Sequence, residues 1–200
     1  MAQQAQNAGE RTSASPLPRP RRIVTGHDAR GRSIILSDGP APNVVSPPGL
    51  PSNVASVMWV TDRVPASNAG NEDTAPAELV PAMGPPHGGV LLRIADFPPD
   101  SEYDGVDIGA MFDHINRGDD PREGVPEENF QKHFWFHKTA TVDYAIVLEG
   151  EIWALLDEGE TRMLPGDVLI QRGTSHAWAN RTDKMTRMAF VLIDAIDDGA

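Results

Sequence analysis

The chain has 200 residues, no cysteine and a formal net charge of −12. Without cysteine it cannot form disulfides, thiolate nucleophiles or cysteine-ligated zinc and iron–sulfur centres. The acidic balance argues against nucleic acid and anionic membranes as partners, because both require clustered Lys and Arg. No apolar run approaches the roughly 20 residues of a spanning helix, and the first ten residues lack the apolar stretch of a signal peptide. We therefore expect a soluble, cytoplasmic protein.

The N-terminal part divides into a predicted flexible tail, residues 1–22, and a segment of strands and loops, residues 23–88. Residues 23–37 predict a hairpin around Asp-Ala-Arg-Gly, and residues 54–61 predict a strand. These strands would cover a barrel within the chain or extend the sheet of a second subunit, so we expect a homodimer. The long loop 65–86 is of the kind that binds a ligand, crosses a partner or is disordered.

The C-terminal part, residues 89–200, predicts an all-β domain. A strand at 89–95 and a short helix at 107–115 precede a series of apolar segments that Glu-Gly, Pro-Gly-Asp and Arg-Gly-Thr separate. Short strands at this spacing are typical of an antiparallel sandwich or barrel.

Two motifs in this part resemble those of the cupin superfamily, small jelly rolls built as a double-stranded β-helix. The first runs from His137 to Gly150 and the second from Pro165 to Asn180, joined by a segment of hairpin character. The family pattern has a His-x-His, a Glu and a further His that together hold a metal. The resemblance covers about residues 89–194 and implies a cupin jelly roll.

The departures from that pattern bear on the chemistry. The resemblance puts His137 and His176 at two of the three histidine positions and Asp143 at the Glu position, while Thr139 replaces the remaining histidine. Such a reduced set could hold Fe, Mn, Ni or Zn with open positions for a substrate. Aspartate reaches one methylene less far than glutamate, so the resemblance is equally consistent with no bound metal.

Strand alternation suggests what else faces the interior. If residues 133–137 form a strand, His133, Trp135 and His137 share one face, and His176 and Trp178 share a face of a later strand. The interior would then be an aromatic-walled pocket for a small molecule, with Trp135, Trp178 and Thr139 as substrate contacts and His133 as the candidate general base. The same tryptophans could instead only fill the core.

Three functions remain open on this sequence. The first is a metal-dependent cupin enzyme acting on a small, largely apolar, aromatic or polyketide-like molecule, as an oxygenase, lyase, decarboxylase or isomerase. The second is a metal-free cupin that binds such a molecule or does acid–base chemistry on it. The third is a structural cupin without a site.

Overall fold

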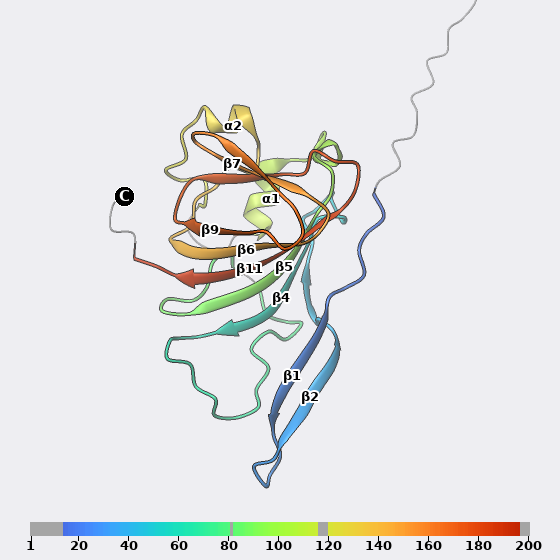
Figure 1. The fold of residues 1–200 in the computed structure, drawn as a ribbon, viewed down its shortest axis with the longest axis vertical. Coiled ribbons are helices and arrows are strands. Elements are labelled where there is room, and N and C mark those ends of the chain that lie inside the picture. The colour runs from blue at the N-terminus through green and yellow to red at the C-terminus, as the bar shows by residue number, and fades with distance from the viewer. Residues whose placement is uncertain (1–13, 81, 116–119, 197–200) are drawn as a thin grey trace, which may run out of the picture.

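The larger of the two facing sheets has six antiparallel strands in the order β3-β4-β5-β11-β6-β9 (Figure 1). In the computed structural model, which describes residues 14–80, 82–115 and 120–196, β11 pairs with β5 on one side and β6 on the other. Met188, Phe190 and Leu192 of β11 are buried because every second residue of a strand faces the same side. The bounds are β3 Asn43–Val45, β4 Val54–Thr61, β5 Val90–Phe97, β6 Thr141–Glu149, β9 Val168–Arg172 and β11 Thr186–Asp194.

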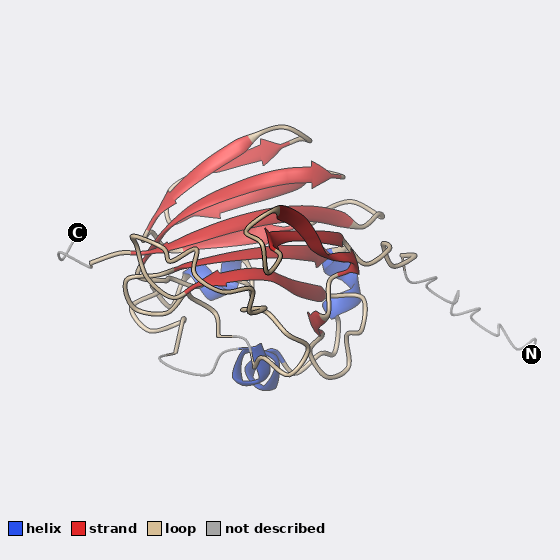
Figure 2. Ribbon diagram, turned by 90° about the horizontal axis from the view of Figure 1, so that it is seen from below, coloured by secondary structure: helices blue, strands red, loops and turns tan. Residues whose placement is uncertain are grey.

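The smaller sheet has three strands in the order β10-β7-β8. It packs across the core from the larger sheet: the ring centroids of Trp178 on β10 and Phe190 on β11 are 5.5 Å apart. Figure 2 shows strands dominating the body, with the helices at its periphery. The predicted all-β jelly roll is confirmed. The bounds are β7 Ile152–Leu156, β8 Glu160–Met163 and β10 His176–Ala179.

The turn between β6 and β7 requires glycine. Gly150 has φ +78°, and a Cβ there would lie 2.6 Å from Oγ1 of Thr186 and 2.7 Å from the carbonyl oxygen of Met185. Any other residue would therefore be strained and would also clash with backbone. The tight connection between β6 and β7, at the end of the first motif, therefore depends on Gly150.

The predicted N-terminal hairpin is confirmed as β1 (Arg21–His27) and β2 (Ser33–Pro40), which extend away from the body (Figure 1). Ile23 and Ile35 on this hairpin are 51% and 62% exposed. Of the predicted tail, residues 1–13 lie outside the described residues. The rest touches the body, since Ala14 N–H donates to Glu102 and the carbonyl of Pro18 accepts from Arg187.

The helical segments lie between β5 and β6. They are a 3₁₀ helix Asp100–Tyr103, α1 Ile108–Ile115 and α2 Asn129–Lys132, and α1 confirms the helix expected at 107–115. None of the described helices is long or apolar enough to span a bilayer.

The predicted strand at 133–137 is wrong. Residues 134 and 135 form a turn directly after α2, and only His137 makes a β-bridge, to His176. The cause is packing against neighbouring segments, because Phe134 lies 4.5 Å from Tyr103 and Trp135 lies 5.3 Å from Phe112, measured between ring centroids. Phe134 and Trp135 are thus both packed against the helical segments that lie between β5 and β6.

Candidate functional site

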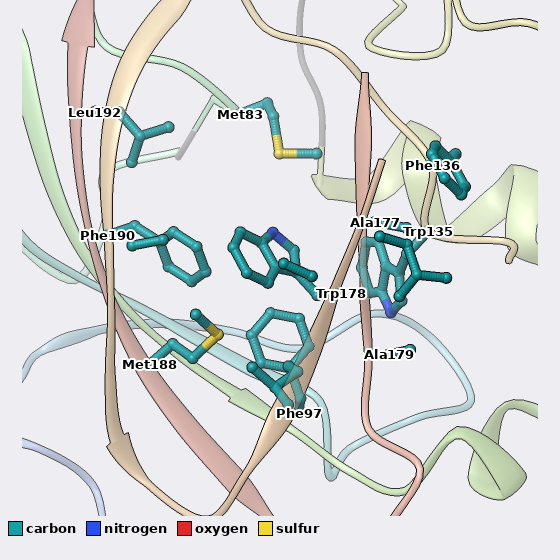
Figure 3. Packing of buried hydrophobic residues seen from close by; sticks show 14 of the residues in the cluster. Met83, Phe97, Trp135, Phe136, Ala177, Trp178, Ala179, Met188, Phe190 and Leu192 are labelled. Carbon is teal, nitrogen blue, oxygen red and sulfur yellow. The ribbon is translucent and has the colours of Figure 1, made fainter. Parts of the chain in front are cut away.

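A cavity of about 90 Å³ lies between the two sheets. A single water needs roughly 10–15 Å³ by this kind of measure, so the space suits a small organic molecule. In Figure 3, Trp178 lies at the centre of the labelled side chains, with Phe190, Phe97 and Met83 around it. The cavity is lined mostly by apolar side chains and by a few polar ones: Val45, Asn53, Ala55, Met83, Arg93, Ala95, Phe97, Trp135, His137, Thr139, Asp143, His176, Trp178, Phe190 and Leu192.

His137 and His176 come together through their backbones. Each donates its N–H to the carbonyl of the other, at 2.9 and 3.0 Å, and their ring centroids are 4.2 Å apart. Both side chains are buried and line the cavity. Residues from two separate sequence motifs thus present their imidazoles at one place.

The hydrogen bonds of the two rings define their tautomers. Nδ1 of His137 lies 2.7 Å from the carbonyl oxygen of Trp135, and Nδ1 of His176 lies 2.9 Å from that of Thr174. A carbonyl oxygen only accepts, so Nδ1 carries the proton and Nε2 keeps its lone pair.

Both imidazoles are held neutral. Burial lowers the pKa of His137, and the charge of Arg93 lowers it further. Burial and the neighbouring His137 ring lower the pKa of His176 well below its usual value. Two neutral imidazoles can therefore accept a hydrogen bond or a proton at Nε2.

Asp143 on β6 faces the same cavity and is only 4% exposed. Its Oδ1 has no hydrogen-bond partner in the described part of the chain. Burial raises its pKa to about 6, against the opposing effects of a hydrogen bond from Thr141 and the charge of Arg93. Thr139, also at the cavity, is 2.7 Å from the Thr141 hydroxyl between oxygen atoms.

Arg93 and Met83 also line the cavity, and the sequence interpretation missed both. Arg93 on β5 donates to the carbonyl oxygen of Ala82 and lies 3.8 Å from the sulfur of Met83. Burial lowers its pKa to about 10, so the guanidinium stays charged at neutral pH. In the sequence, Arg93 alternates with Ala95 and Phe97, so the three side chains could have been placed on one face of the predicted strand. The sequence of the Pro-rich loop gave no comparable indication for Met83.

The loop between β4 and β5 reaches the cavity because several side chains hold it. Arg22 pairs with Asp73 and donates to the carbonyl of Ala75. Nδ2 of Asn43 donates to the carbonyls of Pro76 and Leu79, at 3.0 and 2.7 Å. These contacts attach the loop segment that precedes Met83 to β1 and β3.

His133 is not among the residues that line the cavity. Its ring stacks on Phe134, with centroids 4.3 Å apart, and its Nε2 lies 3.3 Å from Oδ2 of Asp100. Its Nδ1 accepts from the N–H of Trp135. The structure thus places Trp135, Trp178, Thr139, His137, Asp143 and His176 around one cavity and His133 beside it.

No family model matches the chain. It is 30% identical over 185 residues to the cupin-domain-containing oxidoreductase fogC of Aspergillus ruber, covering 90% of this chain and 75% of that protein. It is 30% identical over 215 residues to the cupin-domain-containing oxidoreductase virC of Hypocrea virens, covering 97% and 92%.

One further sequence relative and one solved structure are also similar to this chain. Phomopsin biosynthesis cluster protein D of Diaporthe leptostromiformis is 30% identical over 196 residues, covering 90% of this chain and 80% of that protein. Among solved structures, the Cnp3 cupin domain of Schizosaccharomyces pombe aligns with a TM-score of 0.42 and 10% identity, covering 88% and 89%. The assignment rests on the sequence relatives: with 30% identity over nine-tenths or more of its length, the chain belongs to the cupin superfamily.

Proposed function

We propose that this chain is an enzyme that binds a small, largely apolar molecule in the cavity and moves a proton of that molecule with the His137–His176 pair. The observation that carries the proposal is two neutral imidazoles, both with Nε2 lone pairs, at an aromatic-walled cavity. Apolar walls with a few placed polar groups are the usual composition of a small-molecule site. A purely structural barrel would instead have packed hydrocarbon around these two rings.

The relatives support a role in small-molecule biosynthesis. Two carry the name cupin-domain-containing oxidoreductase and a third is named as a biosynthesis cluster protein. By that kinship we propose a biosynthetic intermediate as the substrate. Trp135 and Trp178 would orient it by stacking against its flat part.

The family resemblance implies a divalent metal, and the residues present do not complete a site for one. Among the described residues no three His, Asp or Glu side chains gather as ligands. Thr139 stands where a third imidazole would be, and the charge of Arg93 acts on both His137 and Asp143. The named relatives are compatible with a metal, but their names specify none. The chemistry proposed below therefore uses only the side chains of this chain.

The sequence-based alternative, a metal held by His137, Asp143 and His176, requires the carboxylate to come within ligand distance of both imidazoles. That alternative predicts a stoichiometric transition metal in protein purified without a chelating column. Our proposal predicts ligand binding that survives exhaustive chelation.

In the proposed chemistry each neutral imidazole accepts at Nε2. A proton leaving the substrate moves to Nε2 while Nδ1–H stays bonded to the carbonyl of Trp135 or Thr174, which holds the ring in place. Burial of the rings excludes bulk water from this transfer. Positioned acid–base groups of this type contribute about 10²- to 10⁴-fold in rate.

The test uses acetophenone, a small aromatic ketone whose methyl protons exchange with D₂O when a base removes them. We expect the protein to accelerate this exchange, followed by proton NMR, and the variants His137→Gln and His176→Gln to lose the acceleration. His114→Gln changes an exposed histidine and should behave like the wild type. No acceleration over buffer would contradict the proposal. So would full acceleration by a variant that combines His137→Gln and His176→Gln.

A further inference from the structure

Two polar groups that line the cavity, the buried Asp143 and the half-buried Arg93, are not used by the proton transfer proposed above. They lie on opposite sides of β11, because Asp143 pairs with Leu192 and Arg93 pairs with Phe190 in the sheet. Strands are about 4.8 Å apart, so their two strands are roughly 10 Å apart. No ion pair joins these two described side chains, although each charge acts on the other.

Each group has hydrogen-bonding capacity left over. Oδ1 of Asp143 is buried without a donor in the described part of the chain. Arg93 has five N–H donors; one Nη bonds to the carbonyl of Ala82 and the other contacts the thioether of Met83, a weak acceptor. Its Nε is buried without a hydrogen-bond partner among the described residues. Leaving such groups unsatisfied is costly in the interior, so a ligand that supplies a donor and an acceptor gains from both.

The charges of the cavity favour a neutral ligand. The lining holds one cationic side chain, Arg93, and one acidic side chain, Asp143, and burial disfavours a charge on either imidazole. A carboxylate ligand would bond to Arg93 but would be repelled by Asp143. A hydroxyl can donate to Asp143, and a carbonyl oxygen can accept from Arg93, without adding charge.

We propose that the substrate is a neutral hydroxy-carbonyl compound with an apolar, aromatic body, whose hydroxyl donates to Asp143 and whose carbonyl oxygen accepts from Arg93. This rests on the proposed function and names the substrate class of the same site. The hydroxyl and the carbonyl lie apart on the ligand, because the two protein groups flank β11. An ortho arrangement, in which the hydroxyl bonds to its own carbonyl, fits less well.

The proposal also assigns Arg93 a role in the reaction. A guanidinium at a carbonyl oxygen stabilises the negative charge that develops there when a proton leaves the neighbouring carbon. The proton goes to Nε2 of a histidine and the electron pair goes to the oxygen as an enolate beside Arg93. The step needs no oxidant and no further reactant.

The first test is a binding series on the wild-type protein, by calorimetry, with 3-hydroxyacetophenone, acetophenone, phenol, ethylbenzene and benzoate as probes. A hydrogen bond to a charged group typically contributes about tenfold or more in affinity. We expect 3-hydroxyacetophenone to bind at least about tenfold tighter than acetophenone or phenol, and benzoate to bind more weakly than acetophenone. Equal affinity for ethylbenzene and 3-hydroxyacetophenone would overturn this inference while leaving the cavity function standing; binding of none of the five probes would overturn both.

The second test separates the two contacts. Arg93→Gln should remove the preference for acetophenone over ethylbenzene, and Asp143→Ala should remove the preference for 3-hydroxyacetophenone over acetophenone. Arg187→Gln is the matched control, because Arg187 pairs with Asp96 and does not line the cavity, and its preferences should equal those of the wild type. Unchanged preferences in folded Arg93→Gln and Asp143→Ala would overturn the inference. The wild-type series decides the matter alone if either variant does not fold.

Discussion

Nδ1 of His137 lies 2.7 Å from the carbonyl oxygen of Trp135, the residue two positions before it. His176 repeats this relationship with Thr174 on the other side of the backbone bridge, at 2.9 Å. The two rings are therefore oriented by their own local backbone, and that orientation does not depend on a bound ion. Because both rings have the same hydrogen-bond pattern, both leave Nε2 available for proton transfer.

Metal removal provides a direct contrast with the sequence-based alternative. Dialysis against EDTA should leave the melting temperature and the acetophenone affinity unchanged, because the folded geometry of the two rings rests on backbone hydrogen bonds. Elemental analysis should find well under one equivalent of transition metal. One equivalent of metal, with a melting temperature that falls on chelation and recovers on Mn(II) addition, would support the metal-dependent enzyme instead.

Two large aromatic residues should respond differently to truncation. Phe136 is fully buried and does not line the cavity, so Phe136→Ala should lower the free energy of unfolding by about 3–5 kcal/mol with the ligand preference order unchanged. Trp178→Leu should instead weaken acetophenone binding, because it removes the aromatic wall. Denaturant unfolding and calorimetry measure the two effects. A Trp178→Leu variant with wild-type affinity would mean that this indole only fills the core.

The Arg22–Asp73 ion pair should make stability depend on pH at the acid end. The hydrogen bond from Arg22 lowers the pKa of Asp73, so the stabilisation is present above the unfolded pKa of about 3.9 and is lost as pH falls through the lower folded pKa. The Asp73 side chain is 40% exposed, so the effect is small, under about 1 kcal/mol. Asp73→Asn should destabilise the protein at pH 7 by more than at pH 3; an equal loss at both values would contradict the assignment.

The hairpin should mediate self-association. Ile35 and Ile23 expose apolar surface on a hairpin that extends from the body, and covering it with a second copy would remove that surface from water. We expect a homodimer by light scattering at micromolar concentration, and a monomer for Ile35→Glu with unchanged circular dichroism. Arg30→Gln, in the exposed turn of the same hairpin, changes the net charge by the same −1 and is the charge-matched control, which should remain dimeric. A monomeric wild type would refute this prediction.

Much of the fold could be predicted from the sequence because its signals are local. The glycine-punctuated strands, the hairpin at 23–37 and the helix at 107–115 all follow from short-range patterns. The segment 133–137 could not be predicted in this way, because its conformation is decided by packing on Tyr103 and Phe112. Tertiary contacts there override the alternation of the sequence.

The site was predicted less completely than the fold. The two motifs identified His137 and His176 because their spacing is a property of the chain itself. Arg93 and Met83 come from a strand and a loop outside both motifs, and only the sheet order and the contacts of the β4–β5 loop bring them to the cavity. A residue whose role depends on such long-range placement leaves little signal in one sequence.

The central claim is that His137 and His176 are neutral, with Nε2 lone pairs facing the ligand. Nitrogen-15 NMR of the imidazole rings, recorded at pH 7 with and without 3-hydroxyacetophenone and assigned with His137→Gln and His176→Gln, measures this directly. We expect both rings to be Nδ1–H tautomers, with Nε2 signals that shift when the ligand is added. Protonated rings, Nε2–H tautomers, or Nε2 signals unmoved by the bound ligand would contradict it.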